Sequence, residues 1–465
     1  MEFAERTHTL GLLALFVLLG LLFRLVPIFR SDLSFAFHPD DSFEYIELAA
    51  GLRSGCGFSR LERGVCEKPE ILRTPGYPAF LTLLPNIRAA LATQAILGIL
   101  SCLLVASWLW YHDCHAAALA ASVLVVFDVP SIVMSTSVMS ETLFGFVLVS
   151  AMGPCVFERM RSSHPFLSAA IAGILGGIAV LIRPIGVILF LLLPIPFLGT
   201  RAISRSKRLL AAGATLLFAV VIPFLWSLRN YRIAHFAGIS TVGAINLYYY
   251  RAANVVAREQ GVLLEDTQKA FGERLGVTYD HIYDANVQSD ALVKKMNRLA
   301  IGILKNRWHE ALAMTLQSLV YLAVAPMRSP LARMLGTKGE SSGIGLSGGA
   351  LTFSRIRNVL QRTLESPGLA FAVVVEVVLT VAVWMGVLLA LVRVRTQPSE
   401  YSVSVVFLTA TALLLLALAA GGEADVRFRA PISPLLAGVA ALGYFAPRSK
   451  WAALTSRRMG TTAVA

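Results

Sequence analysis

The chain has 465 residues, of which 56% are hydrophobic and only 15% are charged, and its formal net charge is +13. Soluble domains carry about 25% charged residues, so this composition excludes a soluble globular protein and indicates several membrane-spanning helices. On a soluble protein the positive charge would indicate nucleic-acid binding. Here the basic residues cluster in short loops between apolar stretches, as the positive-inside rule predicts, and no nucleic-acid partner is expected.

Apolar stretches recur along the chain and predict an all-α polytopic bundle of roughly 10–12 transmembrane helices, since one crossing takes about 20 apolar residues. The first stretch contains Arg24 and no small-residue cleavage site follows it, so we expect a membrane helix and not a cleavable signal peptide. The stretch at 185–198 is short and contains proline, which indicates a broken or partial span. The stretches are 10–29, 91–111, 116–134, 139–157, 166–182, 185–198, 209–228, 311–327, 369–392, 402–420 and 431–446.

Four basic clusters, which begin at Arg159, Arg201, Arg393 and Arg448, set the predicted orientation. Placing all four inside puts the N-terminus inside as well. The stretch at 311–327 must then be re-entrant or lie on the surface, or it must pair with an unrecognised crossing. We expect a single membrane-embedded domain over 1–465, with a first outer loop at 30–90 and an outer region at 229–367 whose topology the sequence leaves open.

The first outer loop carries two adjacent carboxylates, Asp40 and Asp41, just after the first span. Such a pair is costly at a membrane edge unless it does chemistry or binds a cation. One interpretation is that it caps a helix over 43–53; the other is that it supplies a general base or a cation ligand. Asp41 stands four residues before Tyr45, so both share one helix face. The segment 73–78, Arg-Thr-Pro-Gly-Tyr-Pro, then turns the chain back towards the bilayer.

Five cysteines are too few for a disulfide framework, and no spacing predicts a zinc site. Cys56 and Cys66 share the predicted outer loop and can pair in an oxidising compartment, but the sequence does not decide whether they do. Cys102 and Cys155 fall in apolar spans, where we expect them to be buried packing residues.

Further charged residues are predicted at the same face of the membrane. Glu141 stands where an apolar span begins, so it either caps that helix or adds an acidic group to the aspartate pair. Arg183, Arg229 and Arg427 also stand at outer ends of spans, which the positive-inside rule does not predict. An arginine there can anchor its helix by snorkelling, or it can bind a phosphate through two parallel hydrogen bonds. The neighbouring acidic residues favour an anionic ligand.

Together these fragments resemble the GT-C superfamily of integral-membrane glycosyltransferases. Within it they are most similar to the protein mannosyltransferase and lipid A aminoarabinose transferase branch, which uses polyprenyl-phosphate sugars. No fragment is specific alone, and the resemblance depends on their order and spacing. The middle region, 250–367, matches nothing in the family. The fragments are 41–49, 73–78, 140–144, 177–184, 229–231 and the ending Glu423, Arg427, Arg429, Pro431, Pro434.

The resemblance implies an inverting transfer of a sugar from polyprenyl phosphate to a hydroxyl of a lipid, polysaccharide or protein. It places the reaction on the outer face of a bacterial inner membrane. Asp41 would be the base, with Asp40 as the other candidate. The remaining roles follow by group: Arg183, Arg427 and Arg229 would hold the donor phosphate; Glu141, Tyr45, Arg73, Tyr77 and Glu423 would shape the site; and Asp40, Asp41 and Glu141 would hold a divalent metal ion if one is used.

The rival interpretation is a polytopic transporter or lipid flippase. A transporter places its charges near the middle of the membrane, often in repeated halves. The charges of this chain gather at one face, and its two halves show no symmetry.

Overall fold

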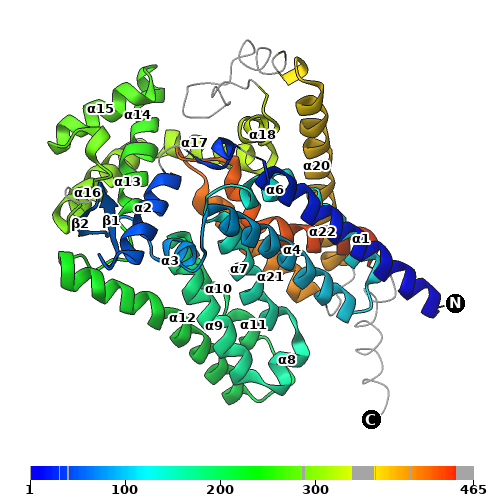
Figure 1. Ribbon diagram of the computed structural model, residues 1–465. Coiled ribbons are helices and arrows are strands. Elements are labelled where there is room, and N and C mark those ends of the chain that lie inside the picture. The colour runs from blue at the N-terminus through cyan, green and yellow to red at the C-terminus, as the bar shows by residue number, and fades with distance from the viewer. Residues whose placement is uncertain are drawn as a thin grey trace.

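The computed structural model describes residues 2–30, 32–38, 41–284, 288–337, 361, 363–396 and 401–446. Most of these residues are in helices, and the strands among them form one two-stranded antiparallel sheet (Figure 1). A bundle of apolar helices makes up most of the molecule, and a smaller group of helices and the sheet pack at one side of it.

Eight of the described helices are long and apolar enough to cross a membrane. A further apolar pair, α5 and α6, is bent by 57°, and two shorter apolar helices cover Glu141–Val156 and Pro184–Leu198. The all-α polytopic prediction is therefore confirmed, and the chain is a multi-pass membrane protein. The bundle comprises α1 (Glu2–Ile28), α4 (Ile87–Tyr111), α5 (His115–Val126), α6 (Val129–Ser135), α7 (Glu141–Val156), α8 (Glu158–Ser163), α9 (Pro165–Ile182), η2 (Pro184–Ile188), α10 (Leu189–Leu192), α11 (Ile195–Leu198), α12 (Arg205–Ala234), α17 (Trp308–Val324), α18 (Arg328–Leu335), α20 (Pro367–Thr396), α21 (Ser402–Ala419), η6 (Val426–Ile432) and α22 (Ser433–Phe445).

Small residues let two long helices approach closely. A Cβ atom added at Gly173 would lie 2.5 Å from the carbonyl oxygen of Thr215, and one added at Gly177 would lie 2.9 Å from that of Ala219. Both glycines are on α9 and both contacts are on α12. The glycines are four residues apart, so they line one face of α9 and bring the two backbones together.

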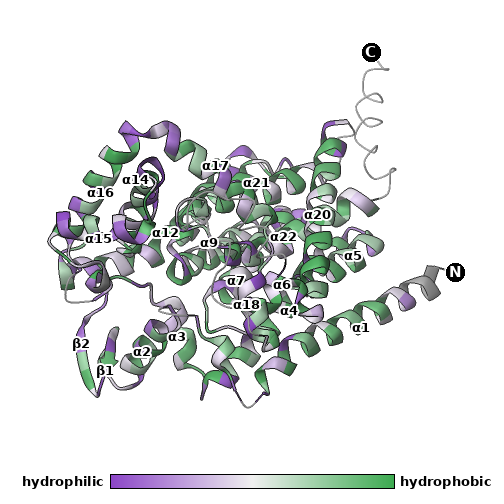
Figure 2. Ribbon diagram, turned by 90° about the horizontal axis from the view of Figure 1, so that it is seen from above, coloured by the Kyte–Doolittle hydropathy of each residue, from purple (hydrophilic) through white to green (hydrophobic). Residues whose placement is uncertain are grey.

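A second, smaller body, which we call the loop subdomain, combines two chain segments that are far apart in sequence: 41–75 and 235–307. Its apolar core joins Ile71 and Leu72 of the first segment to Tyr248, Phe271 and Met296 of the second. Figure 2 shows that its helices carry more polar residues than the bundle. The short helices η1 (Ser34–Ala36) and α3 (Gly76–Thr82) flank the first segment. The loop subdomain itself contains α2 (Asp41–Arg53), β1 (Ser59–Glu62), β2 (Val65–Pro69), α13 (Val242–Ile245), the π-helix η3 (Asn246–Ala252), α14 (Ala253–Gln260), α15 (Leu264–Leu275), η4 (Tyr279–His281) and α16 (Asp290–Asn306).

A disulfide joins Cys56 to Cys66 in the loop subdomain. It closes the turn that leads from α2 through β1 to β2, so the sheet is covalently tied to the end of α2. The pairing that the sequence left open is therefore present.

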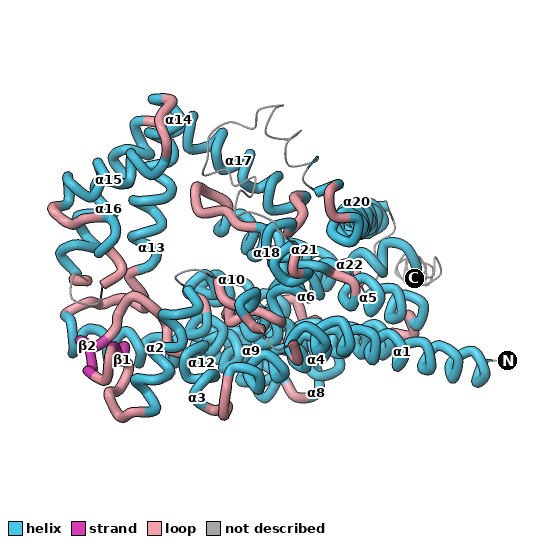
Figure 3. The backbone as a smooth tube through the Cα atoms, turned by 45° about the horizontal axis from the view of Figure 1, so that its top comes forward, coloured by secondary structure: helices cyan, strands magenta, loops and turns pink. Residues whose placement is uncertain are grey.

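Helix α17 packs against the loop subdomain, and Figure 3 shows it between α14 and the bundle. Arg258 of α14 donates to the side chain of Gln317 in the middle of α17 (2.7 Å). Arg30, just after α1, donates to the carbonyl of Met334 on α18 (2.7 Å). The segment Trp308–Leu335 is long and apolar enough to cross a membrane, so a re-entrant or surface position of the stretch 311–327 stays a prediction.

A buried ion pair fixes the end of α17 against two other helices. Arg429 of η6 donates to Glu376 of α20 at 2.7 Å, and the two side chains are only 4% and 2% exposed. Both carboxylate oxygens of Glu376 accept from the backbone N–H of Met327 at 3.0 Å. Arg429 also donates to the carbonyls of Ala323 (3.1 Å) and Ala325 (3.2 Å). One charge pair thus holds α17, α20 and η6 together.

We expect Glu376→Gln to lower the free energy of unfolding by about 3–5 kcal/mol, because it leaves the Arg429 charge buried and unpaired. Thermal unfolding of the purified protein in detergent measures the effect. Glu259→Gln, in the exposed pair with Arg307, is the matched control and should cost about 0–1 kcal/mol. Equal losses of unfolding free energy in the two variants would contradict the stabilising role of the Arg429–Glu376 ion pair.

Candidate functional site

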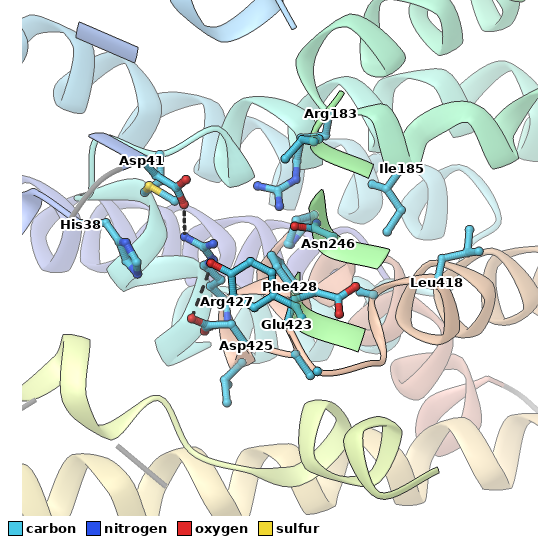
Figure 4. A pocket seen from close by; sticks show the side chains of 18 of the residues that line it. His38, Asp41, Arg183, Ile185, Asn246, Leu418, Glu423, Asp425, Arg427 and Phe428 are labelled. Atoms are coloured by element: carbon cyan, nitrogen blue, oxygen red, sulfur yellow. Dashed lines mark hydrogen bonds and ion pairs between the residues drawn. The ribbon is translucent and has the colours of Figure 1, made fainter. Parts of the chain in front are cut away.

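A cavity of ≈ 2210 Å³ lies between the bundle and the loop subdomain. Its walls come from α2, the segment after β2, η2, η3, α17, α21 and η6. Figure 4 shows Asp41, Arg183, Asn246, Glu423 and Arg427 around this space. The cavity therefore collects polar residues from distant parts of the chain into one site.

Asp41, the first residue of α2, holds two arginines. Its Oδ1 accepts from Nη2 of Arg73 at 2.5 Å, and its Oδ2 accepts from Nη1 of Arg427 at 2.8 Å. Burial opposes ionisation of this carboxyl, but the two guanidinium charges outweigh it and hold the pKa of Asp41 well below its usual range. The next residue, Ser42, fixes the start of α2 by accepting from His38 N–H (2.8 Å) and donating to the carbonyl of Val138 (2.9 Å).

A chain of charges extends from Asp41 into the loop subdomain. Arg73 also pairs with Glu44, which in turn lies 3.4 Å from Arg60, and Arg60 pairs with Glu70 at 3.0 Å. Burial raises the pKa of Glu44 in spite of the two arginines. The Arg73 guanidinium lies over the ring of Tyr45, 5.5 Å from its centroid. This network fixes the direction of Arg73 towards Asp41.

Arg183 and Arg427 share one buried carboxylate. Glu141, at the start of α7, is fully buried, and its Oε1 lies 2.6 Å from Nη1 of Arg183 and 3.6 Å from Nε of Arg427. Arg183 also donates to the hydroxyl of Ser140 (3.0 Å). Both guanidinium groups lie over the ring of Phe428, each 5.2 Å from its centroid. A guanidinium has five N–H donors, so each keeps some for a ligand in the cavity.

A second ion pair lies in the cavity wall, away from Asp41. Nε of Arg251, in the π-helix η3, lies 2.8 Å from Oε1 of Glu423. Burial raises the pKa of Glu423, and the charge of Arg251 opposes that shift. A Cβ atom at Gly422 would lie 2.2 Å from the carbonyl oxygen of Tyr250, so the loop reaches η3 only because residue 422 is glycine. Short π-helices are frequent at functional sites.

Most of the residues that the sequence singled out meet at this cavity. Glu141 lies behind Arg183 and not in the wall, and Tyr77 is buried behind Tyr45 with its hydroxyl donating to Gln94 (2.7 Å). Asp40 lies outside the described residues. The predicted site residues that line the cavity are Asp41, Tyr45, Arg73, Arg183, Glu423 and Arg427.

The prediction that Arg229 joins the phosphate site is not met, because its guanidinium does not line the cavity. It donates to the carbonyl oxygens of Glu70 (2.6 Å) and Phe58 (3.2 Å). It also lies over the ring of Trp226, 4.7 Å from the centroid. These contacts tie α12 to the loop subdomain, so Arg229 has a structural role.

Of the suggested metal ligands Asp40, Asp41 and Glu141, the structure describes Asp41 and Glu141. Both oxygens of Asp41 accept from arginines, and Glu141 faces two arginines. In the described ranges no three His, Cys, Asp or Glu residues gather as metal ligands. These carboxylates are arranged for ion pairing with guanidinium groups, and no step below depends on a metal.

Sequence reasoning missed Glu44, Asn246, Tyr250 and Arg251, all of which line the cavity. Glu44 could have been found, because it stands three residues after Asp41 and so shares its helix face. Tyr250 and Arg251 stand at the start of the middle region, 250–367, and Asn246 stands just before it, where no motif distinguishes them from solvent-exposed residues.

Among solved structures, the chain is similar to the archaeal oligosaccharyltransferase AglB from Archaeoglobus fulgidus in complex with an inhibitory peptide and a dolichol-phosphate. The TM-score is 0.51 with 15% identity, over 94% of this chain and 50% of that chain. The apo form of the Archaeoglobus fulgidus oligosaccharyltransferase gives a TM-score of 0.50 with 14% identity, over 95% and 51%. The chain has the GT-C fold.

This likeness confirms the fold that the sequence resemblance implied. The chain spans about half the length of these oligosaccharyltransferases. ArnT from Cupriavidus metallidurans also matches, with a TM-score of 0.36 and 17% identity over 93% of this chain and 77% of that chain. No family model and no curated protein matches the sequence.

Asp41→Asn is expected to lower the unfolding temperature by an amount that stays constant from about pH 8 to about pH 5. The folded-state pKa lies below the unfolded value of about 3.9. The ion pairs therefore stabilise the protein above that value and lose this contribution only as the pH falls through the folded-state pKa. Thermal unfolding of wild type and variant across this range measures the difference.

Glu44→Gln is the matched comparison. Because burial raises the pKa of Glu44, the folded protein binds a proton there more tightly than the unfolded chain does, so wild type should gain stability relative to Glu44→Gln as the pH falls through that raised pKa, whereas its difference from Asp41→Asn stays constant. A wild-type advantage over Asp41→Asn that has vanished by about pH 5 would contradict the lowered pKa.

Proposed function

We propose that this protein transfers a sugar from a polyprenyl-phosphate donor to an acceptor hydroxyl, with inversion at the anomeric carbon, on the outer face of a bacterial inner membrane. The observation that carries the proposal is the cavity itself. In a GT-C fold, it combines an ionised carboxylate at Asp41, two arginines at Arg183 and Arg427, and an apolar wall.

The apolar wall suits a polyprenyl chain. It includes Ile185 of η2, Val320 of α17, and Leu415 and Leu418 of α21. Arg183 directly precedes η2, so an isoprenoid tail along this wall would bring its phosphate to the arginine. Burial of apolar surface gives about 25 cal/mol per Å², which makes a long isoprenoid a strong anchor. A solved relative in fold binds dolichol-phosphate, which supports this class of donor.

The residues divide the reaction between them. The acceptor hydroxyl loses its proton to the Asp41 carboxylate, and its oxygen forms a bond to the anomeric carbon of the sugar. The bond from that carbon to the phosphate oxygen breaks, and the electron pair leaves with polyprenyl phosphate. Arg183 and Arg427 stabilise the negative charge that develops on this phosphate. Attack opposite the leaving group inverts the configuration.

Arg427 couples donor binding to the strength of the base. Without a ligand it pairs with Asp41 and keeps that carboxylate weakly basic. A donor phosphate competes for the same guanidinium, because charge-assisted bonds to phosphate oxygens are strong. When Arg427 turns to the phosphate, the pKa of Asp41 rises. The base thus becomes effective once the donor is in place.

Two features support an outer-face site. The Cys56–Cys66 disulfide belongs to the loop subdomain, and disulfides persist in oxidising compartments. The basic clusters at Arg201 and Arg393 stand at the opposite ends of their helices from the site, where the positive-inside rule places the cytoplasm.

Asp41→Asn is expected to abolish transfer while leaving the donor bound, because it removes the proton acceptor at constant size.

Arg183→Lys and Arg427→Lys should each weaken donor binding or rate by about one to two decades, since lysine lacks the two-point grip and a charge-assisted contact is worth about 1.5–3 kcal/mol. Transfer and binding of a polyprenyl-phosphate sugar by protein in nanodiscs provide both measurements.

Arg229→Lys is the matched control, because it removes a guanidinium outside the cavity and should leave donor affinity unchanged. Wild-type turnover by Asp41→Asn, or equal effects of all three lysine variants, would contradict the assignment. Movement of the donor lipid across vesicle membranes without sugar transfer would support the transporter instead.

The orientation gives a separate prediction. In a chain with its three free cysteines replaced by alanine, Arg63→Cys in the exposed β1–β2 turn should react with an impermeant thiol reagent added to whole cells. Arg201→Cys, in the exposed loop before α12, should react only after the membrane is opened. The reverse pattern would place the site in the cytoplasm and rule out the outer-face reaction.

A further inference from the structure

We infer that the wall formed by η3 and the loop over 420–425 is the acceptor subsite, and that the acceptor it takes is a saccharide. This inference rests on the proposed function, because it names the second substrate of the same cavity. It concerns a wall on the side of the loop subdomain, whereas the apolar helices of the bundle supply the wall assigned to the donor tail.

The π-helix arranges the polar side chains of this wall. Asn246, Leu247, Tyr250 and Arg251 all line the cavity. Asn246 and Tyr250 are four residues apart, and so are Leu247 and Arg251. Because the π-helix η3 (Asn246–Ala252) has a wide turn, the two residues of each pair lie on the same side of the helix. Figure 4 shows that Asn246 faces the same space as Arg183 and Glu423. The acceptor wall therefore faces the arginines that hold the phosphate in the proposed reaction.

One carboxylate oxygen of Glu423 has no hydrogen-bond partner among the described residues. Its Oε1 pairs with Arg251, but Oε2 is buried and has no hydrogen-bond partner among the described residues. Leaving a buried carboxylate oxygen unpaired costs about 1–3 kcal/mol or more. A ligand hydroxyl that donates to Oε2 would remove this cost, and neighbouring hydroxyls of a sugar ring present two such donors to one carboxylate.

Asn246 adds both a donor and an acceptor. The residue is partly buried and lines the cavity. An amide can donate two hydrogen bonds and accept two. A sugar hydroxyl does both, so this pairing favours a polyhydroxylated ligand over one with a single hydroxyl.

Three tyrosines complete the wall. The hydroxyl of Tyr250 lies 3.1 Å from that of Tyr279 and 2.8 Å from that of Tyr283, and all three residues line the cavity. Aromatic rings offer an apolar face together with a polar edge. A pyranose or furanose ring has the same two parts, a C–H face and a rim of hydroxyls.

Other acceptors satisfy this wall less well. An alkyl alcohol brings a single hydroxyl, so it cannot bind both the Glu423 carboxylate and the Asn246 amide. A serine or threonine side chain brings one hydroxyl, which cannot satisfy both residues at once. The close fit of Gly422 against Tyr250 holds the loop against η3, so the two segments form one continuous wall.

The test uses the full chain in nanodiscs on two printed arrays, one of bacterial surface oligosaccharides and one of serine- and threonine-containing peptides. Decaprenyl phosphate is titrated separately as the probe of the phosphate site. We expect wild type to bind oligosaccharides and not peptides. Glu423→Gln and Asn246→Ala should each weaken oligosaccharide binding at least tenfold and leave the decaprenyl-phosphate affinity unchanged, which also shows that both variants are folded. Glu259→Gln, an exposed carboxylate of the loop subdomain, should change neither affinity.

Oligosaccharide binding that survives both substitutions overturns the subsite, and so does binding to peptides alone or to neither array. Failure of the wild-type protein to bind decaprenyl phosphate overturns the proposed function, and with it the acceptor role of this wall. The two readouts are independent, so the failure of one proposal is distinguishable from the failure of the other.

Discussion

The structure of the site depends on one shared interaction: the guanidinium of Arg427 between Asp41 and Glu141. Arg427 and Asp41 are 386 residues apart in sequence. A buried charge is tolerated only when other charges and hydrogen bonds compensate for its lost hydration. The start of α2, the start of α7 and η6 must therefore meet at one point, and the cavity forms around that point.

A second ion pair holds η6, the short helix that carries Arg427. Two residues after Arg427, Arg429 pairs with Glu376 and holds three carbonyl or carboxylate groups of α17 and α20. The backbone that carries Arg427 is therefore held in place by this second ion pair. In the proposed reaction, a donor phosphate would replace a carboxylate partner of Arg427, and the basicity of Asp41 would change without a large movement of the chain.

The two walls of the cavity differ because they come from different environments. The bundle contributes Leu415 and Leu418, which belong to a helix selected for apolar surroundings. The loop subdomain contributes Asn246 and Arg251, and Arg251 is the residue that pairs with Glu423. Asn246 and Arg251 belong to a region that water can reach. In the proposed reaction, a lipid donor would lie against the apolar helices and a hydroxylated acceptor against η3 and the loop over 420–425, with the arginines and Asp41 at the reaction centre.

The sequence by itself determined the membrane class and the helical fold, and it predicted one site for Asp41, Arg183 and Arg427, which the structure brings to the same cavity. A charge at the end of an apolar span is costly, so its presence is informative even without coordinates. Sequence position gives the level of a side chain in the membrane but not its direction, and this is why Arg229 was assigned to the phosphate although it lies over Trp226. Only the tertiary structure showed that Glu423 meets the π-helix, because that contact depends on the missing side chain of Gly422 and on the folding of two distant loops into one body.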